Sequence, residues 1–268
     1  LVTPITFGEL SGNDVTVDMF ANISKWDVEH IALAKLADLF VVAPATADII
    51  GKVANGIADD MLSTTIMATK AKVLFVPSMN TNMYENPIVQ ANMEKLRSFG
   101  YEFVEPESGH LACNTSGKGR FPTLTTILDC AEKCIYGREL LKGKKVVVSA
   151  GGTQEKIDPV RFISNRSSGR QGYAIAKAAW MEGADVTLVS CTTALPAPYG
   201  VKMVYVQDAR ELEKAMNAEY DSCDAAIMAA AVSDYRPTVQ ADQKIKKEDF
   251  DSLHIDLTQN PDILYGLG

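Results

Sequence analysis

The sequence predicts an α/β protein of two domains, each built on a mainly parallel sheet. Apolar runs of strand length alternate with segments of helical periodicity along the chain, as expected for strand–helix–strand units. The alternation stops once, at the polar and basic stretch 137–145, and then starts again. A length of 268 residues also suits two ordinary domains. We therefore expect one domain over 1–138 and a second over 139–268.

The first half is expected to open with a loop, TPITFGELSG, and then to alternate between helices and strands. The chain begins with Leu1 rather than Met, so we expect an internal part of a longer protein. Helices are predicted over 27–37, from Thr46 to about Gly56, and over 59–69, 86–98 and 123–136, strands over 38–44, 72–77 and 101–105, and a glycine-rich loop over 106–122.

The second half repeats this alternation in a Rossmann-like pattern. The chain stops soon after an apparent helix start at Asn260-Pro261-Asp262, so we expect this domain to be truncated too. Strands are predicted over 145–150, 185–190, 203–206 and 224–231, helices over 169–184 and 209–218, and a long glycine-rich loop between the first strand and the first helix.

Composition excludes several classes of protein. The chain is 47% hydrophobic and 22% charged, which is ordinary for a globular protein. No apolar run approaches the roughly 20 residues of a membrane span, and a net charge of -8 argues against nucleic-acid binding. Five scattered cysteines do not form a disulfide framework, so we expect a cytoplasmic protein.

The glycine-rich loop of the second half is a candidate phosphate site. Backbone N–H groups and a helix N-terminus favour anions, and Arg161, Arg166 and Arg170 suit a substrate with several phosphates. Asp234, after the last strand, is placed for a ribose or a metal, and Lys244 for a phosphate. A helix cap and a solvated basic patch are the structural alternatives. The loop is too long for a dinucleotide fingerprint.

Three residues of the first half carry side chains suited to catalysis. His30 lies on a predicted helix, and imidazole is a common general base in enzymes, although a lone helical histidine is usually structural. Asn80 offers a donor and an acceptor for a carboxylate, or else forms a turn. Cys113 lies in the glycine-rich loop, where the neighbouring Lys118 and Arg120 would lower the pKa of its thiol.

Longer motifs resemble the bacterial bifunctional phosphopantothenoylcysteine decarboxylase/phosphopantothenate–cysteine ligase family of coenzyme A synthesis. The ligase half is resembled by residues 145–268 and the decarboxylase half by residues 1–136. The family's N-terminal strand and its glycine–serine turn are absent from this sequence. The matching stretches are AGGTQEKIDPVRFISNRSSGRQGYAIA, AAAVSDYRP, KIKK and NPDIL for the ligase, and VEHIALAKLADLFVVAPATADIIGKVANGIADDML, VPSMNTNMY and SGHLACNTSGKGR for the decarboxylase.

For the first domain the resemblance implies a flavodoxin-like or Rossmann-like flavoprotein that binds FMN. It implies that His30 is the catalytic base, that Asn80 binds the substrate carboxylate, and that Cys113 is the proton donor. The FMN contacts would be Thr46, Ala47, Asp48 and Ser78. Two residues depart from the usual family pattern: Asp48 stands in place of Asn, and Asn114 in place of Gly.

For the second domain the resemblance implies a Rossmann-like ligase that activates a carboxylate with CTP and Mg²⁺. Asn165 would serve formation of an acyl-cytidylate, and Lys244 its conversion to the amide by cysteine. Arg161 would bind the substrate, and Asp234 the Mg²⁺ ion. The CTP contacts would be Met228, Ala229, Ala230, Asp234, Lys244, Asn260, Pro261, Asp262 and Ile263.

The resemblance also implies partners. These are 4′-phosphopantothenate, cysteine and CTP, with no nucleic acid and no membrane, in a homo-oligomer where ligase dimers and decarboxylase trimers build a dodecamer. Two other functions remain open from the sequence. One is a non-catalytic flavoprotein regulatory subunit, which would lack His30, Asn80 or Cys113; the other is a simple nucleotide-binding module.

Overall fold

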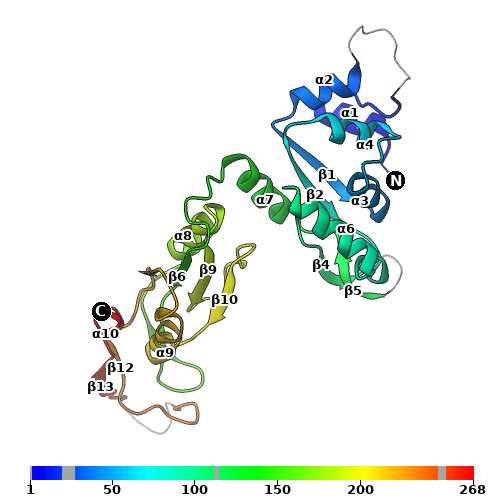
Figure 1. Cartoon of the computed structure of the whole chain (residues 1–268). Helices are drawn as coiled ribbons and strands as arrows, with labels where there is room; N and C mark the ends of the chain where they lie inside the picture. The colour runs from blue at the N-terminus through cyan, green and yellow to red at the C-terminus, as the bar shows by residue number, and fades with distance from the viewer. Residues whose placement is uncertain (1, 20–27, 112–114, 247–251) are drawn as a thin grey trace. The chain divides into compact units, whose positions relative to one another are not determined.

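The computed structural model describes residues 2–19, 28–111, 115–246 and 252–268. It divides into two compact units, Leu1–Tyr136 and Gly137–Gly268, close to the boundary expected at residue 138 (Figure 1). Each unit contains its own cluster of buried apolar side chains. Among the described residues, no helix is both long and apolar enough to cross a membrane.

The first unit is built on a parallel sheet of strand order β1-β2-β3, with β1 at Leu39–Ala45, β2 at Lys72–Pro77 and β3 at Glu102–Phe103. Strand β2 buries five consecutive residues, which explains why it is a continuous apolar run in the sequence. Helices α3 (Ala47–Ala54) and α6 (Pro87–Ser98) pack together over the core, and α7 (Leu124–Tyr136) packs against β1 and β2.

The opening segment is a helix, so the expectation of a loop was wrong. Helix α1 (Pro4–Ser11) begins with proline in its first turn and ends at Gly12, whose φ of 65° closes the helix. None of its residues is buried. It therefore lacks the apolar stripe from which a helix is recognised in a sequence. Of the remaining helices, α2 (Glu29–Leu36) packs against α4 (Met61–Ala68), and α5 spans Thr81–Tyr84.

The two glycine-rich loops contain short antiparallel hairpins that were not expected. In the first unit, β4 (Glu107–His110) pairs with β5 (Ser116–Arg120). In the second unit, β7 (Gln154–Lys156) pairs with β8 (Phe162–Ser164). Glycine is depleted in strands, so composition pointed to loops. Cross-strand hydrogen bonds and packing against the rest of each unit decide otherwise.

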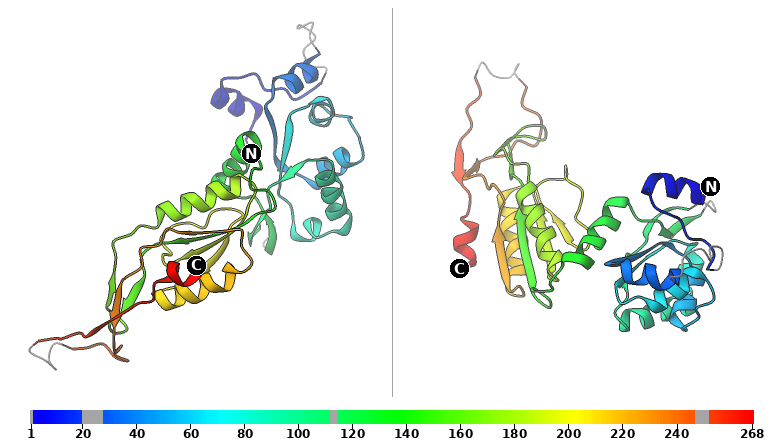
Figure 2. Two further views of the ribbon diagram at one scale, coloured as in Figure 1. Left: turned by 60° about the vertical axis from the view of Figure 1, so that its left-hand side comes forward. Right: turned by 90° about the horizontal axis from the view of Figure 1, so that it is seen from above.

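The second unit is built on a parallel sheet of order β10-β9-β6-β11. Numbered from β6, this is the order 3-2-1-4 with which a doubly wound sheet begins. Helices α8 and α9 lie on opposite faces of it (Figure 2), as right-handed crossovers require when the winding direction reverses. The bounds are β6 Lys145–Ala150, α8 Arg170–Met181, β9 Asp185–Ser190, β10 Lys202–Tyr205, α9 Ala209–Tyr220 and β11 Ala225–Met228.

Strand β11 ends before the expected residue 231. The backbone N–H groups of Ala229 and Ala230 donate to the hydroxyl of Ser149, at 3.1 Å each, and so leave the ladder. The chain then forms an antiparallel pair, β12 (Tyr235–Pro237) with β13 (Leu257–Gln259). Helix α10 (Ile263–Leu267) follows, and the Asp262 side chain caps it, which agrees with the predicted helix start.

Candidate functional site

The candidate FMN residues come from two segments that lie at the carboxyl ends of neighbouring strands. Strand β1 leads into Thr46, Ala47 and Asp48, and β2 leads into Ser78. The backbone N–H of Ser78 donates to the carbonyl of Ala45 at 3.1 Å, which joins the two segments directly. Ligands of open α/β sheets bind at such strand ends.

The first of these segments starts helix α3. Thr46 is the N-cap, and its Oγ1 accepts from the N–H of Ile49 at 3.4 Å. The carboxylate of Asp48 is exposed in the first turn, 3.8 Å from the ammonium of Lys52. Thr46 and Asp48 are both exposed, and Ala47 is half-buried. This helix start is therefore open to a ligand, which fits the flavin expected there.

Asn80 is the N-cap of α5, and its Oδ1 accepts from the N–H of Asn82 at 2.9 Å. The turn-forming role considered for this residue is therefore present in the structure. The side chain is half-buried and follows Ser78 and Met79 at the end of β2. Its role towards a substrate carboxylate stays a prediction.

The glycine-rich hairpin packs against the loop that carries Asn80. The N–H of Met79 donates to the carbonyl of Gly119 at 3.1 Å. A Cβ on Gly119 would lie 2.2 Å from the Met79 carbonyl oxygen, and one on Gly117 would lie 2.4 Å from Oγ1 of Thr81. Only glycine permits this approach. Cys113 and Asn114 belong to the same segment but lie outside the described residues.

His30 is placed less directly. It is half-buried in the first turn of α2, next to Glu29, whose carboxylate accepts from the Thr16 hydroxyl at 2.6 Å. The packing of α2 against α4 fixes the helix that carries it. The proposed role as a base rests on the resemblance and stays a prediction.

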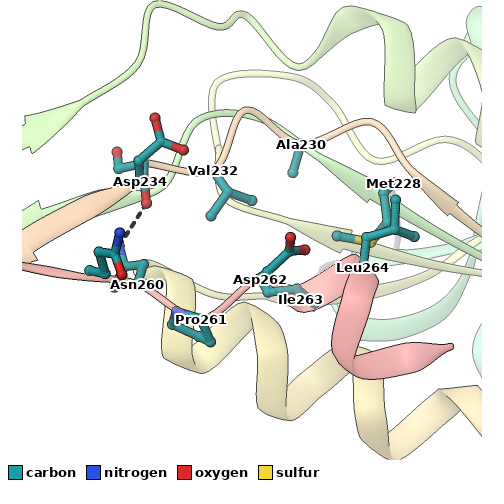
Figure 3. A pocket seen from close by; sticks show the side chains of 11 residues that line it. Met228, Ala230, Val232, Asp234, Asn260, Pro261, Asp262, Ile263 and Leu264 are labelled. Carbon is teal, nitrogen blue, oxygen red and sulfur yellow. Dashed lines mark hydrogen bonds between the residues drawn. The ribbon is translucent and has the colours of Figure 1, made fainter.

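In the second unit, the segment after β11 and the segment before α10 enclose a cavity of about 510 Å³ (Figure 3). Most of the predicted CTP contacts line it, from two stretches about 30 residues apart in the chain. The predicted residues in the lining are Met228, Ala230, Asp234, Asn260, Pro261, Asp262 and Ile263; those that the sequence reasoning missed are Val232, Ser233, Gln259 and Leu264. Val232 and Ser233 lie inside the AAAVSDYRP motif, which was the available signal.

Hydrogen bonds hold the two walls of this cavity together. The N–H of Asn260 donates to the carbonyl of Asp234 at 2.8 Å, and its Nδ2 donates to the carbonyl of Ser233 at 2.8 Å. The N–H of Ser233 donates to Oγ1 of Thr153 in the glycine-rich loop at 2.9 Å. Oγ of Ser233 is buried and has no hydrogen-bond partner among the described residues. The cavity wall thus contains a buried hydroxyl oxygen that the described part of the chain leaves without a hydrogen bond.

Asn165 also reaches this wall from the glycine-rich loop. Its Nδ2 donates to the carbonyl of Val232 at 2.9 Å. A Cβ on Gly152 would lie 2.7 Å from the backbone oxygen of Asn165, so glycine is required where the loop folds back. The structure therefore brings the residue expected to serve acyl-cytidylate formation to the candidate nucleotide cavity.

Like Asn165, three further candidate residues are not part of the cavity lining. Ala229 contributes its backbone to the hydrogen bond with Ser149, and Lys244 is exposed. Arg161 directs its guanidinium at the buried carboxylate of Asp158, with Nε 2.9 Å from Oδ2. The expected substrate contact of Arg161 stays a prediction.

The cavity lining contains the kind of donors that a magnesium–nucleotide complex would need, although its binding stays a prediction. Asp234 and Asp262 both line the cavity (Figure 3), and their like charges would repel a triphosphate. Mg²⁺ is usually held by one or two carboxylates together with substrate phosphates. Within the described ranges no cluster of three His, Cys, Asp or Glu side chains could hold a metal by itself.

Comparisons with known proteins show which families the chain resembles. The model of the family "Flavoprotein" matches residues 1–136, and that of the "DNA/pantothenate metabolism flavoprotein C-terminal domain" matches residues 141–268. A "Coenzyme A biosynthesis bifunctional protein CoaBC" from Bacillus subtilis is 45% identical over 100% of this chain and 66% of its own length. The protein of the same name from Vibrio cholerae is 43% identical over 98% of this chain and 66% of its own.

A solved structure, the "C-terminal Domain of Coenzyme A biosynthesis bifunctional protein CoaBC", has 44% sequence identity, covers 48% of this chain and 59% of that chain, and has a TM-score of 0.41. This chain thus spans slightly less than two thirds of the length of the curated relatives it matches. The chain belongs to the Flavoprotein family, and it resembles the bifunctional coenzyme A biosynthesis proteins along its length.

Proposed function

We propose that this chain carries both activities of its bifunctional relatives. The first is ligation of 4′-phosphopantothenate with cysteine, driven by CTP through an acyl-cytidylate. The second is FMN-dependent decarboxylation of 4′-phosphopantothenoylcysteine to 4′-phosphopantetheine. The observation that carries the proposal is the cavity that the AAAVSDYRP and NPDI segments line together, with Asn165 joined to its wall.

In the ligase unit, the side chains around the cavity divide the work. Asp234 and Asp262 would hold Mg²⁺ with the CTP phosphates, and the ion would neutralise charge during displacement of pyrophosphate. Asn165, fixed on Val232 through one N–H of its Nδ2, would donate the other N–H to the substrate carboxylate and so orient it towards the α-phosphate. The Lys244 ammonium would then stabilise the phosphate charge that develops when the amine of cysteine expels CMP.

In the decarboxylase unit, FMN would supply reversible two-electron chemistry on the cysteine thiol, so that net redox is zero. The chain's own groups would do the rest. Thr46 and Ser78 would hold the flavin at the strand ends, and Asn80 would orient the substrate carboxylate. His30 would accept the proton from the substrate, and Cys113 would return one to the product. We further propose that the protein is a cytoplasmic homo-oligomer, with ligase dimers and decarboxylase trimers.

A product assay tests the proposal. The full-length protein is purified and supplied with 4′-phosphopantothenate, cysteine and CTP. We expect equal amounts of pyrophosphate, CMP and CO₂, and a yellow preparation whose flavin absorbance is retained on gel filtration. ATP in place of CTP serves as the nucleotide control. Absence of CMP with bound flavin present would reject the ligase activity and leave the decarboxylase to be assayed on the ligated substrate.

The Lys244→Gln variant separates the two ligase steps. Because Lys244 is exposed, its replacement leaves the fold intact. We expect pyrophosphate release to continue, CMP release to fall, and the acyl-cytidylate to be detectable by mass spectrometry after an early quench. Equal loss of pyrophosphate and CMP would show that Lys244 only binds CTP. Wild-type rates of both would assign KIKK to a solvated basic patch.

A further inference from the structure

The ion pair between Asp158 and Arg161, in the glycine-rich loop, forms hydrogen bonds with the backbone of Ile245, the residue after Lys244. Asp158 accepts from the backbone N–H of Ile245 at 3.2 Å through Oδ2. Arg161, which forms a salt bridge with the same carboxylate, donates from Nη2 to the carbonyl of Ile245 at 2.6 Å. Both backbone polar groups of one residue are therefore held by one side-chain pair, although 84 positions separate Arg161 from Ile245.

The carboxylate of Asp158 is itself held in place by the turn that carries it. Asp158 is 1% exposed, and its Oδ1 accepts from the N–H groups of Val160 and Arg161 at 2.8 Å each. Burial alone would raise the pKa of this carboxyl, but these hydrogen bonds and the guanidinium lower it well below the usual range. A charged, buried and fully bonded carboxylate has one arrangement rather than many.

A second hydrogen bond joins the same turn to Ala241, three residues before Lys244. The turn at 157–161 closes on itself, with the N–H of Ile157 donating to the carbonyl of Arg161 at 2.9 Å. The carbonyl of Ile157 accepts from the N–H of Ala241 at 3.0 Å. The segment 241–245 is therefore fixed at both ends to one turn of the glycine-rich loop, and Lys244 lies between the two contacts.

We propose that Asp158 and Arg161 are positioning residues, which fix the backbone beside Lys244 so that its ammonium meets the departing CMP. This inference rests on the ligase activity proposed above. It reassigns Arg161, whose Nε and Nη2 already bond to protein groups, from binding substrate to holding the lysine segment. We call the Asp158–Arg161 pair, with its two hydrogen bonds to Ile245, the clamp. The clamp fixes the backbone beside Lys244, so that only the side chain of Lys244 has to adopt the right rotamer.

Hydrogen exchange tests the clamp without any assay of activity. In the full-length protein, Arg161→Met should speed exchange of the Ile245 and Ala241 amides while leaving strands β6 and β9 unchanged. Arg210→Met, on an exposed position of α9, is the matched control and should change neither. Arg161→Lys keeps the charge but loses the fork of donors, so it should restore protection only in part. Unchanged exchange in Arg161→Met overturns the clamp.

Kinetics then test whether the clamp acts through Lys244. We expect Arg161→Met to keep pyrophosphate release near the wild-type rate and to lower CMP release by about 10- to 100-fold, the usual cost of a small misplacement. Arg161→Met combined with Lys244→Gln should be no slower than Lys244→Gln alone, because both act on one step. A raised KM for 4′-phosphopantothenate with additive losses in the double variant would instead show direct substrate binding and reject the proposal.

The two levels of the inference fail separately. If the wild-type protein releases neither pyrophosphate nor CMP, the ligase activity is rejected, and the positioning role is rejected with it. The exchange experiment would in that case still show whether Asp158 and Arg161 hold the segment. If the wild type is active and Arg161→Met loses protection without any change in CMP release, the clamp is structural only.

Discussion

Lys118 donates from its ammonium to Oε2 of Glu105 across 2.7 Å, and this contact ties the glycine-rich hairpin to the segment that follows β3. The same carboxylate accepts from the hydroxyl of Tyr84 and from Arg97, each at 2.7 Å. Burial would raise the pKa of Glu105, but the hydrogen bonds from Lys118 and Tyr84 hold it below its ordinary value. The hydrogen bond to Glu105 raises the pKa of Lys118. Lys118 therefore has a partner other than the thiol of Cys113 that the sequence suggested for it.

Removing this ammonium should loosen the hairpin. In Lys118→Met we expect faster hydrogen exchange of the β4 and β5 amides and little change in β2, because only one anchor of the hairpin is lost. Lys95→Met, at an exposed position on α6, is the control. Because the pKa of Glu105 is lowered, the ion pair should persist below the ordinary glutamate pKa of 4.5 and be lost as the pH falls through the lowered pKa. Equal exchange in both variants would contradict an anchoring role.

Gly119→Ala should separate the hairpin from the Asn80 loop. The new methyl group would meet the Met79 carbonyl at 2.2 Å, and φ is +140° at this position. We expect a lower midpoint of urea unfolding and weaker retention of flavin. Gly51→Ala is the matched control, because its Cβ would have no neighbour nearer than 3.8 Å and alanine favours a helix. If Gly119→Ala and Gly51→Ala unfolded at the same urea midpoint, the close contact between Gly119 and the Met79 carbonyl would be ruled out.

His30→Asn should block decarboxylation and spare the ligase. The residue lies in the first unit, and the candidate nucleotide cavity lies in the second. We expect CO₂ release to disappear while CMP release continues at the wild-type rate, with circular dichroism confirming the fold. Loss of CMP in a folded variant would contradict the division of labour between the units.

Cys113→Ser should stop turnover after CO₂ has left. A hydroxyl retains the shape of the thiol but is far less acidic, so it returns a proton poorly. We expect the oxidised, decarboxylated ene-thiol to accumulate and 4′-phosphopantetheine to disappear, as measured by mass spectrometry. Cys134→Ser provides a control in the same unit, because burial raises the pKa of that thiol and makes it a poor acid. Normal product from Cys113→Ser would remove the residue from the mechanism.

Asp60→Ala should destabilise the first unit by about 1 kcal/mol, the usual cost of losing an N-cap. Asp60 begins α4 in a capping box with Ser63, and hydrogen bonds from Lys52 and Ser63 lower its pKa to about 2. Its contribution should be complete above the unfolded pKa of 3.8 and be lost as the pH falls towards 2. Asp59→Ala, which removes an exposed partner of Lys52 but no cap, is the control in urea unfolding.

The sequence predicted the buried strands well and the antiparallel pairs poorly. Strands β2, β6 and β9 match their predicted bounds because parallel strands covered on both faces are continuous apolar runs. The hairpin β4–β5 is rich in glycine, which local propensity assigns to a loop. Its pairing is stabilised by tertiary packing on Met79 and Thr81, which no short window of sequence contains.

The candidate site divides in the same way. Motif resemblance located most of the cavity lining, and the omission of Ser233 shows that a motif does not reveal which of its side chains face inwards. The contacts of Arg161 could not be predicted, because a positive charge predicts an anionic partner but does not tell a bound substrate from a carboxylate of the protein. Its partner is a buried carboxylate three residues earlier in the chain.

The place of β11 in its sheet has a consequence for the order of folding. Ser149, at the end of β6, meets Ala229 and Ala230 across separations of 80 and 81 residues. Contacts at such separations form late, because a long loop must close first. A nascent chain that ends before β11 has the glycine-rich loop but neither wall of the cavity, because both walls come from residues 228–264. The proposed affinity for a nucleotide should therefore appear in one step, once β11 has docked and residues 259–264 have been made, rather than grow as the domain lengthens.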